Sequence, residues 1–376
     1  MSKIALSTSH LSGHELPYIQ AALESNQVSV YGDNLTGFEN DLESYLQKEV
    51  KIACTISGTA AIHLALILAG ISRDDEVLCQ SMTYSASVNP IIYQGAIPVF
   101  IGSEKETWNM CPEALETAIK DRISKGKTPK AIIVVHSYGM PAKMDEIVAI
   151  ANQYKITLIE DAAESLGSTY KGQHCGTFGD FAALSFNGNK IITTSGGGAI
   201  ICKTTAIKNK AIFLATQARD KTPHYQHSEI GYNYRMSNII AGIGRGQMKV
   251  LEKHVALRRE VNQFYKNIFK DVEGVTVFQE HASYCKSNYW LTCITIDETK
   301  VAFNREDIRL ALQKENIETR PLWKPMHLQP IFAKYTYYGT NFCENLFNSG
   351  LCLPSGSNLT TQEKQRIVEV MASFLA

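Results

Sequence analysis

The chain has 376 residues, and its 37 lysines and arginines balance 37 aspartates and glutamates, so its formal net charge is zero. This balance argues against a basic face for nucleic acid, and any phosphate would have to be recognised locally. The nine cysteines include no C-x-x-C pair, which argues against a zinc ribbon or a thioredoxin-like site and is typical of free thiols in a reducing compartment.

The N-terminal segment predicts a helix over residues 16–26 and shows no secretory signal, because no positive stretch precedes a long apolar core. The longest apolar run, residues 60–71, is too short to span a bilayer and contains His63. We therefore expect a cytoplasmic protein that binds neither membranes nor nucleic acid.

A predicted helix that starts at the sequence SGT offers a site for an anion. Ser57, Gly58 and Thr59 follow a predicted strand, residues 51–56, and precede strong helix formers that are apolar nearly all round, as in a buried helix. Free N–H groups of the first turn, the helix dipole and the small Gly58 can together bind a phosphate. The same sequence is also an ordinary N-cap, and the motif alone favours capping.

Further strand candidates alternate with helices such as residues 145–154. The apolar runs lie at residues 76–82, 97–102, 131–136, 156–161, 182–186 and 198–203. This rhythm predicts a mostly parallel sheet covered by helices on both faces. Tyr84 follows one of these runs and can offer its ring to a heteroaromatic cofactor, although a buried tyrosine with a bonded hydroxyl is the more frequent role.

The segment from Glu160 to Gly198 carries the strongest chemical signal. Asp161 ends one predicted strand, at the edge where ligands collect in open α/β sheets, and Lys190 follows another. A pyridoxal phosphate (PLP) enzyme needs this pair, an amine for the Schiff base and a carboxylate that keeps the pyridine nitrogen protonated. Ser185 adds a hydroxyl for a phosphate. Taken singly, Lys190 is more simply a solvated lysine and Asp161 an N-cap of a helix at AAESL.

The C-terminal part predicts a separate α+β unit. Residues 239–269 show a long helical pattern that leads away from the sheet, residues 287–296 predict a strand, and residues 305–316 predict a helix. We expect a large domain over residues 1–250 and a small domain over residues 251–376.

Two groups of polar residues have simpler alternatives. His224 and His227 lie three residues apart without a Cys or acid cluster at ligand spacing, so no metal site is expected. Trp323 presents a rigid apolar surface near Lys324 and His327, which can meet a diphosphate or a keto oxygen. The alternatives are that Trp323 is a packing anchor and His327 a bonded loop histidine.

From about Leu6 to the C-terminus the chain resembles the sugar aminotransferases of the DegT/DnrJ/EryC/StrS type, which are PLP enzymes of fold type I. The motifs that carry the resemblance are SGTAAIHLAL, TYSAS, HSYGMPAKMD, EDAAES, SFNGNK, GGGA, GYNYRMSN and RPLWKPMH. The resemblance implies an aspartate aminotransferase-like large domain with a mostly parallel seven-stranded sheet, and a smaller α+β domain. Within the family, SFNGNKIITTSGGG and ETRPLWKPMHLQPIF are most similar to the branch that aminates C4 of a UDP-linked 4-keto-6-deoxy-GlcNAc in bacillosamine synthesis.

The resemblance also implies roles at the cofactor. Lys190 would form the Schiff base and move the proton, and Asp161 would pair with the pyridine nitrogen. The other implied contacts are phosphate binding by the backbone of Thr59 and Ala60 beside Gly58 and by the hydroxyl of Ser185, ring stacking by Tyr84, and phosphate binding by Asn233 of the neighbouring subunit. Active sites shared within a homodimer are therefore expected.

Glu164 departs from the commoner pattern, since many relatives carry Gln or His at this position near the 3′-oxygen of the cofactor. A carboxylate beside a phenolate must share a proton, so its protonation state stays open. On the sugar side, the resemblance implies contacts from a loop and from the C-terminal part. These residues are Asn26, Gln27, Val28 and Ser29 in the loop, and Trp323, Lys324, Met326, His327 and Tyr338 in the C-terminal part.

The resemblance implies that L-glutamate gives its nitrogen to PLP and leaves as 2-oxoglutarate, after which C4 of a nucleotide-linked 4-keto-6-deoxy sugar accepts the amine. The preferred sugar is UDP-2-acetamido-2,6-dideoxy-hexos-4-ulose. Both halves use Lys190, so ping-pong kinetics are expected. The alternatives are another UDP- or dTDP-keto sugar and a non-catalytic nucleotide-sugar sensor. A sugar dehydratase is disfavoured, because those relatives lack the lysine.

Overall fold

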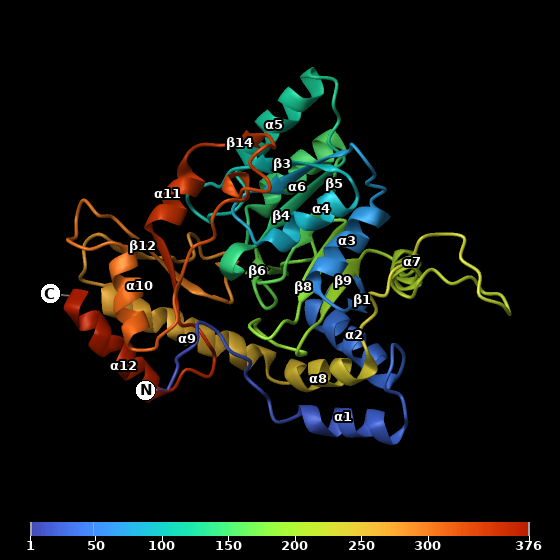
Figure 1. Ribbon diagram of the computed structural model, residues 1–376, viewed down its shortest axis with the longest axis horizontal. Coiled ribbons are helices and arrows are strands. Elements are labelled where there is room, and N and C mark those ends of the chain that lie inside the picture. Colours follow the sequence, from blue (N-terminus) through green and yellow to red (C-terminus); the bar gives the residue numbers. More distant parts are fainter. Residues whose placement is uncertain (1, 48, 375–376) are drawn as a thin grey trace.

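The computed structural model describes residues 2–47 and 49–374, and one eight-stranded sheet lies at its centre (Figure 1). Its strands are β1 (Lys51–Thr55), β2 (Glu76–Gln80), β3 (Ile97–Ile101), β4 (Ala131–Val135), β5 (Thr157–Asp161), β8 (Phe181–Ser185), β9 (Gly198–Cys202) and β14 (Tyr337–Tyr338). They are ordered β1-β9-β8-β5-β4-β2-β3-β14. Strand β9 runs antiparallel to β1 and β8, and the other neighbours pair in parallel.

The predicted mostly parallel α/β sheet is confirmed, and its seven predicted strands lie where the apolar runs placed them. The eighth strand, β14, comes from the C-terminal part of the chain and pairs with β3 through Tyr337 and Tyr338. A strand of two residues has no run of its own, so it was not predicted.

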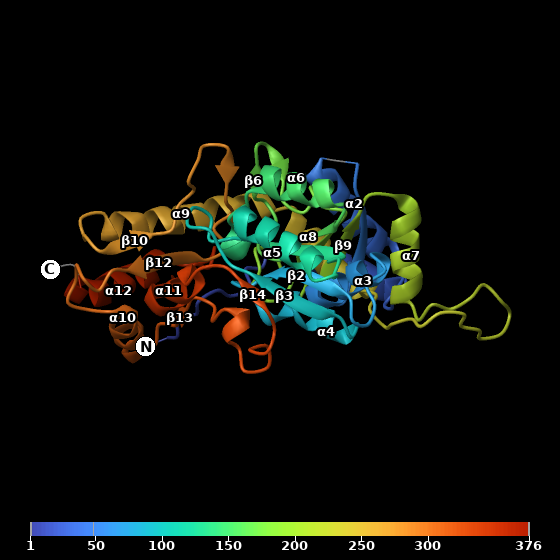
Figure 2. The same ribbon diagram turned by 90° about the horizontal axis from the view of Figure 1, so that it is seen from above.

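Helices cover both faces of this sheet (Figures 1 and 2). They are α1 (Glu15–Glu24), α2 (Asp33–Leu46), α3 (Gly58–Leu68), α4 (Asn89–Tyr93), α5 (Pro112–Ser124), α6 (Met144–Tyr154), α7 (Thr205–Ala215) and α8 (Asn238–Met248). Side chains alternate along each strand, so Val77 and Cys79 of β2 pack with α3 and α4, while Leu78 packs with α5 and α6. Helices α2 and α8 cover the second face at β1, β8 and β9.

The C-terminal part forms a four-stranded antiparallel sheet with its own core. Its strands are β10 (Val275–Val277), β12 (Thr292–Ile296), β13 (Arg320–Pro321) and β15 (Gly350–Leu353), in the order β10-β12-β15-β13, and its helices are α9 (Leu251–Phe269), α10 (Arg305–Lys314), α11 (Phe342–Ser349) and α12 (Thr361–Met371). A small sheet of β6 (Thr169–Tyr170), β7 (Gln173–His174) and β11 (Cys285–Lys286) completes the fold. Ile4 joins the C-terminal core and bridges to Ile317.

Two predicted elements differ from the structure. The helical pattern at residues 239–269 is divided between α8, which packs on α1 and α2, and α9, which packs on β10 and β12. The strand predicted at residues 287–296 starts only at Thr292, because Tyr289 has a left-handed φ of 45° that an extended strand cannot contain. The domain division between residues 250 and 251 stays a prediction.

A long segment between α7 and α8 projects from the sheet domain in both views (Figures 1 and 2). Tyr225 and Ile230 lie on it with 79% and 83% of their surface exposed. Within residues 2–47 and 49–374, no helix is long and apolar enough to cross a membrane.

Candidate active site

A cavity of about 780 Å³ lies between the carboxyl edge of the large sheet and the C-terminal part. It brings together residues predicted from widely separated motifs. Those from the sheet side include Gly58, Thr59, Tyr84, Asp161, Glu164, Ser185 and Lys190, and those from the C-terminal side include Trp290, Arg320, Trp323 and Lys324. The carboxyl ends of parallel strands meet at one edge, which explains why Asp161 and Ser185 meet here.

The N-terminus of α3 forms a cradle of backbone groups at one end of the cavity. The Ser57 hydroxyl accepts the Ala60 N–H at 3.1 Å, so the predicted N-cap exists, and the Ala60 N–H is already bonded. The first-turn N–H groups of Gly58 and Thr59 face no intrahelical acceptor. A Cβ on Gly58 would lie 3.1 Å from the Ser185 Cβ, a tight contact, so the start of α3 and the end of β8 approach one another closely. This cradle, with the Ser185 hydroxyl, fits a phosphate.

Asp161 ends β5 as a buried carboxylate held in a fixed orientation. The Ser87 hydroxyl donates to its Oδ2 at 2.6 Å, and the Ala163 N–H donates to its Oδ1 at 3.2 Å. Thr83 lies 2.7 Å from the Ser87 hydroxyl and holds it in turn. Residues 162–167 form turns, so no helix starts there for Asp161 to cap.

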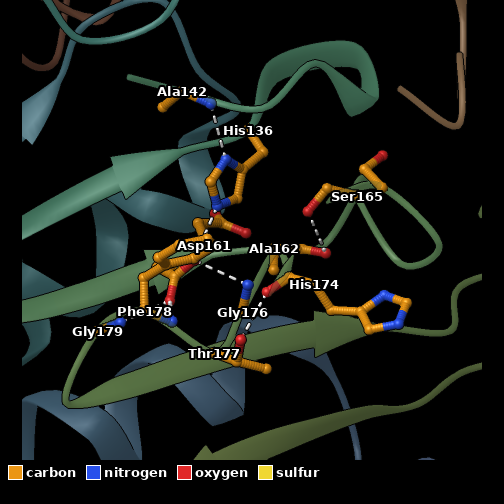
Figure 3. A network of polar contacts seen from close by, with 12 residues as sticks. His136, Ala142, Asp161, Ala162, Ser165, His174, Gly176, Thr177, Phe178 and Gly179 are labelled. Carbon is orange, nitrogen blue, oxygen red and sulfur yellow. Dashed lines mark hydrogen bonds and ion pairs between the residues drawn. The ribbon is translucent and has the colours of Figure 1, made fainter. Parts of the chain in front are cut away.

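The neighbouring Glu160 anchors the end of β5 through bonds to His136, Gly176, Phe178 and Gly179, which are labelled in Figure 3. Its buried carboxylate accepts the N–H groups of Gly176, Phe178 and Gly179, each at 2.7 Å. His136 lies 3.0 Å from the same carboxylate, and its other ring nitrogen accepts the Ala142 N–H, so the proton of His136 lies on Nε2. Because the Glu160 carboxylate is hydrogen-bonded on both oxygens, it keeps the adjacent backbone of Asp161 in place.

Lys190 is mostly buried and is not a solvated surface lysine. Its Nζ lies 3.3 Å from Glu164 Oε1 and 4.2 Å from the centre of the Trp290 ring. Burial raises the pKa of Glu164 to about 7, although Lys190 and the Tyr138 N–H, which donates to Glu164 at 2.8 Å, both favour the ionised form. The amine and this carboxyl therefore face one another inside the cavity.

These groups fit the expected cofactor. The phosphate cradle, the Asp161 carboxylate and the Lys190 amine line one cavity, as a phosphorylated pyridine aldehyde requires. Tyr84 stands at its mouth with 62% of its surface exposed.

Several predicted contacts lie outside the cavity of a single chain. They are Asn26, Gln27, Val28, Ser29, Ala60, Asn233, Met326, His327 and Tyr338. His327 is bonded between the Ser81 hydroxyl at 2.7 Å and Glu344 at 2.9 Å, and Tyr338 bonds to Asp121. The backbone carbonyl of Gln27, in the predicted loop, accepts a hydrogen bond from the side-chain amide of Asn238 at the start of α8. The cofactor roles of Ala60 and Asn233 and the substrate roles of the other residues stay predictions.

Three residues of the site escaped sequence reasoning. Trp290 and Arg320 line the cavity, and Ser87 holds Asp161. Ser87 lies in the motif TYSAS and Arg320 in the motif RPLWKPMH. The hydroxyl of Ser87 and the charge of Arg320 could therefore have indicated a role in the site. Trp290 offered no such signal, because only packing brings it to Lys190.

Comparison with known proteins places the whole chain in one group. Residues 10–372 match the profile of the DegT/DnrJ/EryC1/StrS aminotransferase family. The chain is 50% identical over 374 residues to EpsN of Bacillus subtilis (strain 168), provisionally assigned as a pyridoxal phosphate-dependent aminotransferase, with 98% of this chain and 95% of that protein covered. It is 37% identical over 365 residues to a GDP-perosamine synthase of Escherichia coli O157:H7, covering 97% and 96%. A DegT DnrJ EryC1 StrS aminotransferase from Brucella abortus has the same fold, with a TM-score of 0.89, 28% identity, and coverage of 97% and 96%.

Proposed function

The chain belongs to the DegT/DnrJ/EryC1/StrS aminotransferase family and is a PLP-dependent aminotransferase, and from this premise we propose that its acceptor is a nucleotide-linked keto sugar. L-Glutamate donates the nitrogen, and C4 of a 4-keto-6-deoxy sugar receives it. The preferred acceptor is UDP-2-acetamido-2,6-dideoxy-hexos-4-ulose, which yields the UDP-4-amino sugar of bacillosamine-type glycans. The reaction takes place in the cytoplasm. The GDP-perosamine synthase among the relatives supports a nucleotide-linked acceptor.

The observation that carries the proposal is the composition of the cavity. Asp161 and Lys190 line it from the sheet side, and Arg320, Trp323 and Lys324 line it from the C-terminal part. Arg320 pairs with Glu318, another lining residue, at 2.8 Å, while Lys324 contributes a second cation. Positive side chains in the lining suit the diphosphate that joins the sugar to the nucleotide. The Trp323 ring, which stacks on Tyr138 with 4.5 Å between the ring centres, offers a rigid flat surface. The volume of about 780 Å³ lies in the upper part of the ~300–1,000 Å³ range of small-molecule sites, so an acceptor larger than an amino acid fits.

The residues of the site divide the work. PLP, when bound, supplies an electron sink for the carbon that loses its proton. The Lys190 Nζ would move that proton from the α-carbon of glutamate to the cofactor carbon C4′, and in the second half it would move a proton from C4′ to C4 of the sugar. The Asp161 carboxylate would keep the pyridine nitrogen protonated, and Ser185 and Thr59 would hold the phosphate and so fix the position of the ring.

The working unit in this proposal is a homodimer. Asn233 is exposed and does not line the 780 Å³ cavity, and Tyr84 and Ile56 are exposed residues that do line it. The projecting segment before α8 carries Asn233 and exposed apolar side chains, which suits contact with a second copy. Asn233 of one subunit would then complete the phosphate site of the other.

A substrate panel tests the reaction. The protein with PLP and ¹⁵N-glutamate is incubated with UDP-, dTDP- and GDP-linked 4-keto-6-deoxy sugars, and the products are weighed by mass spectrometry. We expect ¹⁵N in the UDP-N-acetyl sugar, with Lys190→Ala as the inactive control. Binding of a nucleotide sugar without nitrogen transfer would support a sensor instead, and faster labelling of another sugar would replace the proposed acceptor.

Subunit mixing tests the dimer. Lys190→Ala and Asn233→Ala proteins, each inactive alone, should regain activity when their subunits exchange, because one of the two sites in a mixed dimer has both residues intact. A severe loss in Asn233→Ala alone is required for this design. No recovery after demonstrated exchange, or an active monomer, would show that Asn233 serves its own chain or only the fold.

A further inference from the structure

Lys190 lies in the loop that follows β8, and Trp290 contacts this loop at two points. The loop follows β8, and residues 187–190 have no regular structure. The Trp290 Nε1–H donates to the carbonyl of Asn189, directly before Lys190, at 2.7 Å. The face of the same indole lies 4.2 Å from the Lys190 Nζ. The Ser7 hydroxyl also donates to the Asn189 carbonyl, at 2.8 Å, but Trp290 contacts both this carbonyl and the amine of Lys190.

Trp290 is itself held rigidly. It is 5% exposed, its backbone N–H donates to Asn288 Oδ1 at 2.8 Å, and its carbonyl accepts a bond from the buried Arg258. The Asn288 amide also donates to the backbone carbonyl of Glu164 at 2.8 Å. The Asn288–Trp290 segment therefore positions both partners of the ion pair between Lys190 and Glu164.

We propose that Trp290 is a positioning residue for Lys190, which fixes the lysine loop through its indole N–H and holds the free ammonium over its ring against Glu164. The inference rests on the proposed transamination, because only a lysine that is released and recaptured in each cycle needs a resting place. A cation over an indole face is attracted by the ring quadrupole, most strongly when it is shielded from water, as here. The C-terminal part of the chain thereby takes part in the chemistry of the sheet domain.

A residue that only packs in the core would be as buried as Trp290. The test must therefore change the charge distribution of the Trp290 ring, its quadrupole, without changing the shape of the ring. Site-specific replacement of Trp290 by mono-, di- and trifluorinated tryptophan weakens the quadrupole stepwise while the indole N–H and outline remain. The measurement is the rate at which acetic anhydride modifies Lys190 in the full-length, cofactor-free chain, read by peptide mass spectrometry. Lys208, which pairs with Glu39 and Glu43, serves as the internal reference.

We expect the Lys190 rate to rise with each fluorine, by about two- to fivefold over the series. Trp290→Phe, which keeps a ring but loses the N–H, should give an intermediate rise, and Trp290→Leu the largest. Trp108→Phe is the matched control, since Trp108 is equally buried and stacks on Phe278 at 3.7 Å. In the PLP-loaded enzyme, the Trp290 variants should lower kcat several-fold and leave the KM for glutamate nearly unchanged.

A flat rate across the fluorinated series, with unchanged melting temperature, would overturn the proposal and leave Trp290 as a packing residue. The series decides the question even when Trp290→Leu fails to fold. The labelling needs no sugar, so a failed substrate panel and a failed positioning role give different results.

Discussion

A methyl group at Gly198 should displace the phosphate cradle. Gly198 is the first residue of β9 and pairs with Thr55 on one side and Ser185 on the other, so its backbone cannot move freely. An added Cβ would lie 2.3 Å from the carbonyl carbon of Ser57 and 2.4 Å from the nitrogen of Gly58. In Gly198→Ala, the start of α3 has to move.

The size of the effect follows from these distances. Ordinary contacts begin at 3.4 Å, so the Ser57–Gly58 peptide must shift by about 1 Å. An N–H donor at ~2.9 Å from a phosphate oxygen would then stand at ~3.9 Å, beyond hydrogen-bonding distance. Loss of one bond to a charged group costs about 1.5–3 kcal/mol, or about 10- to 150-fold in affinity for PLP. Overpacking adds about 1–3 kcal/mol of lost stability.

The assay is the dissociation constant of PLP, measured by absorbance titration, together with the melting temperature of the cofactor-free protein. Gly196→Ala is the matched control for stability, because its Cβ would meet nothing within 4 Å. We expect an unchanged melting temperature in the control and a loss of both affinity and stability in Gly198→Ala. Wild-type PLP affinity in Gly198→Ala would refute the role of this cradle.

Four further outcomes are expected. Borohydride should fix a pyridoxyl group on the peptide that contains Lys190, and Lys190→Ala should abolish it; labelling of a different lysine would contradict the assignment. Asp161→Asn should still bind PLP, but its activation barrier for transamination should rise by several kcal/mol, where ~1.4 kcal/mol corresponds to a tenfold lower rate. Near-normal activity of this variant would show that Asp161 has only a structural role. Ser87→Ala should lower kcat about tenfold through loss of the 2.6 Å bond to Asp161, and Ser87→Thr should restore it, which steady-state kinetics will check. Burial raises the pKa of Glu164 from 4.5 to about 7. Between these pH values the folded, cofactor-free protein keeps a proton that the unfolded chain releases. Its free energy of unfolding should therefore fall by about 3 kcal/mol as the pH rises from 4.5 to 7. Glu164→Gln should flatten this part of the pH profile in urea unfolding, and an unchanged slope would place the ionisation elsewhere.

The amino-acid sequence alone determined the features that depend on neighbouring residues. Apolar runs predicted the seven strands of the sheet domain, since burial on both faces leaves a continuous apolar stretch. The position of Asp161 at a strand end and of Ser57 before a helix follows from the same local patterns. The pairing of Asp161 with Lys190 came from the chemistry that both groups serve, and the structure places both in one cavity.

Contacts between distant segments were decided only by the tertiary structure. Trp290 contacts Lys190 although 100 residues separate them in the sequence, and Ser87 contacts Asp161 across 74 residues. The periodicity of apolar residues cannot predict contacts between such distant segments. The pattern of residues 239–269 is continuous, yet α8 packs on α1 and α2 whereas α9 packs on β10 and β12, so the helix is interrupted between Met248 and Leu251. Apolar periodicity tells which face of an element is buried but not what buries it, and the partner is chosen by the packing of the whole chain.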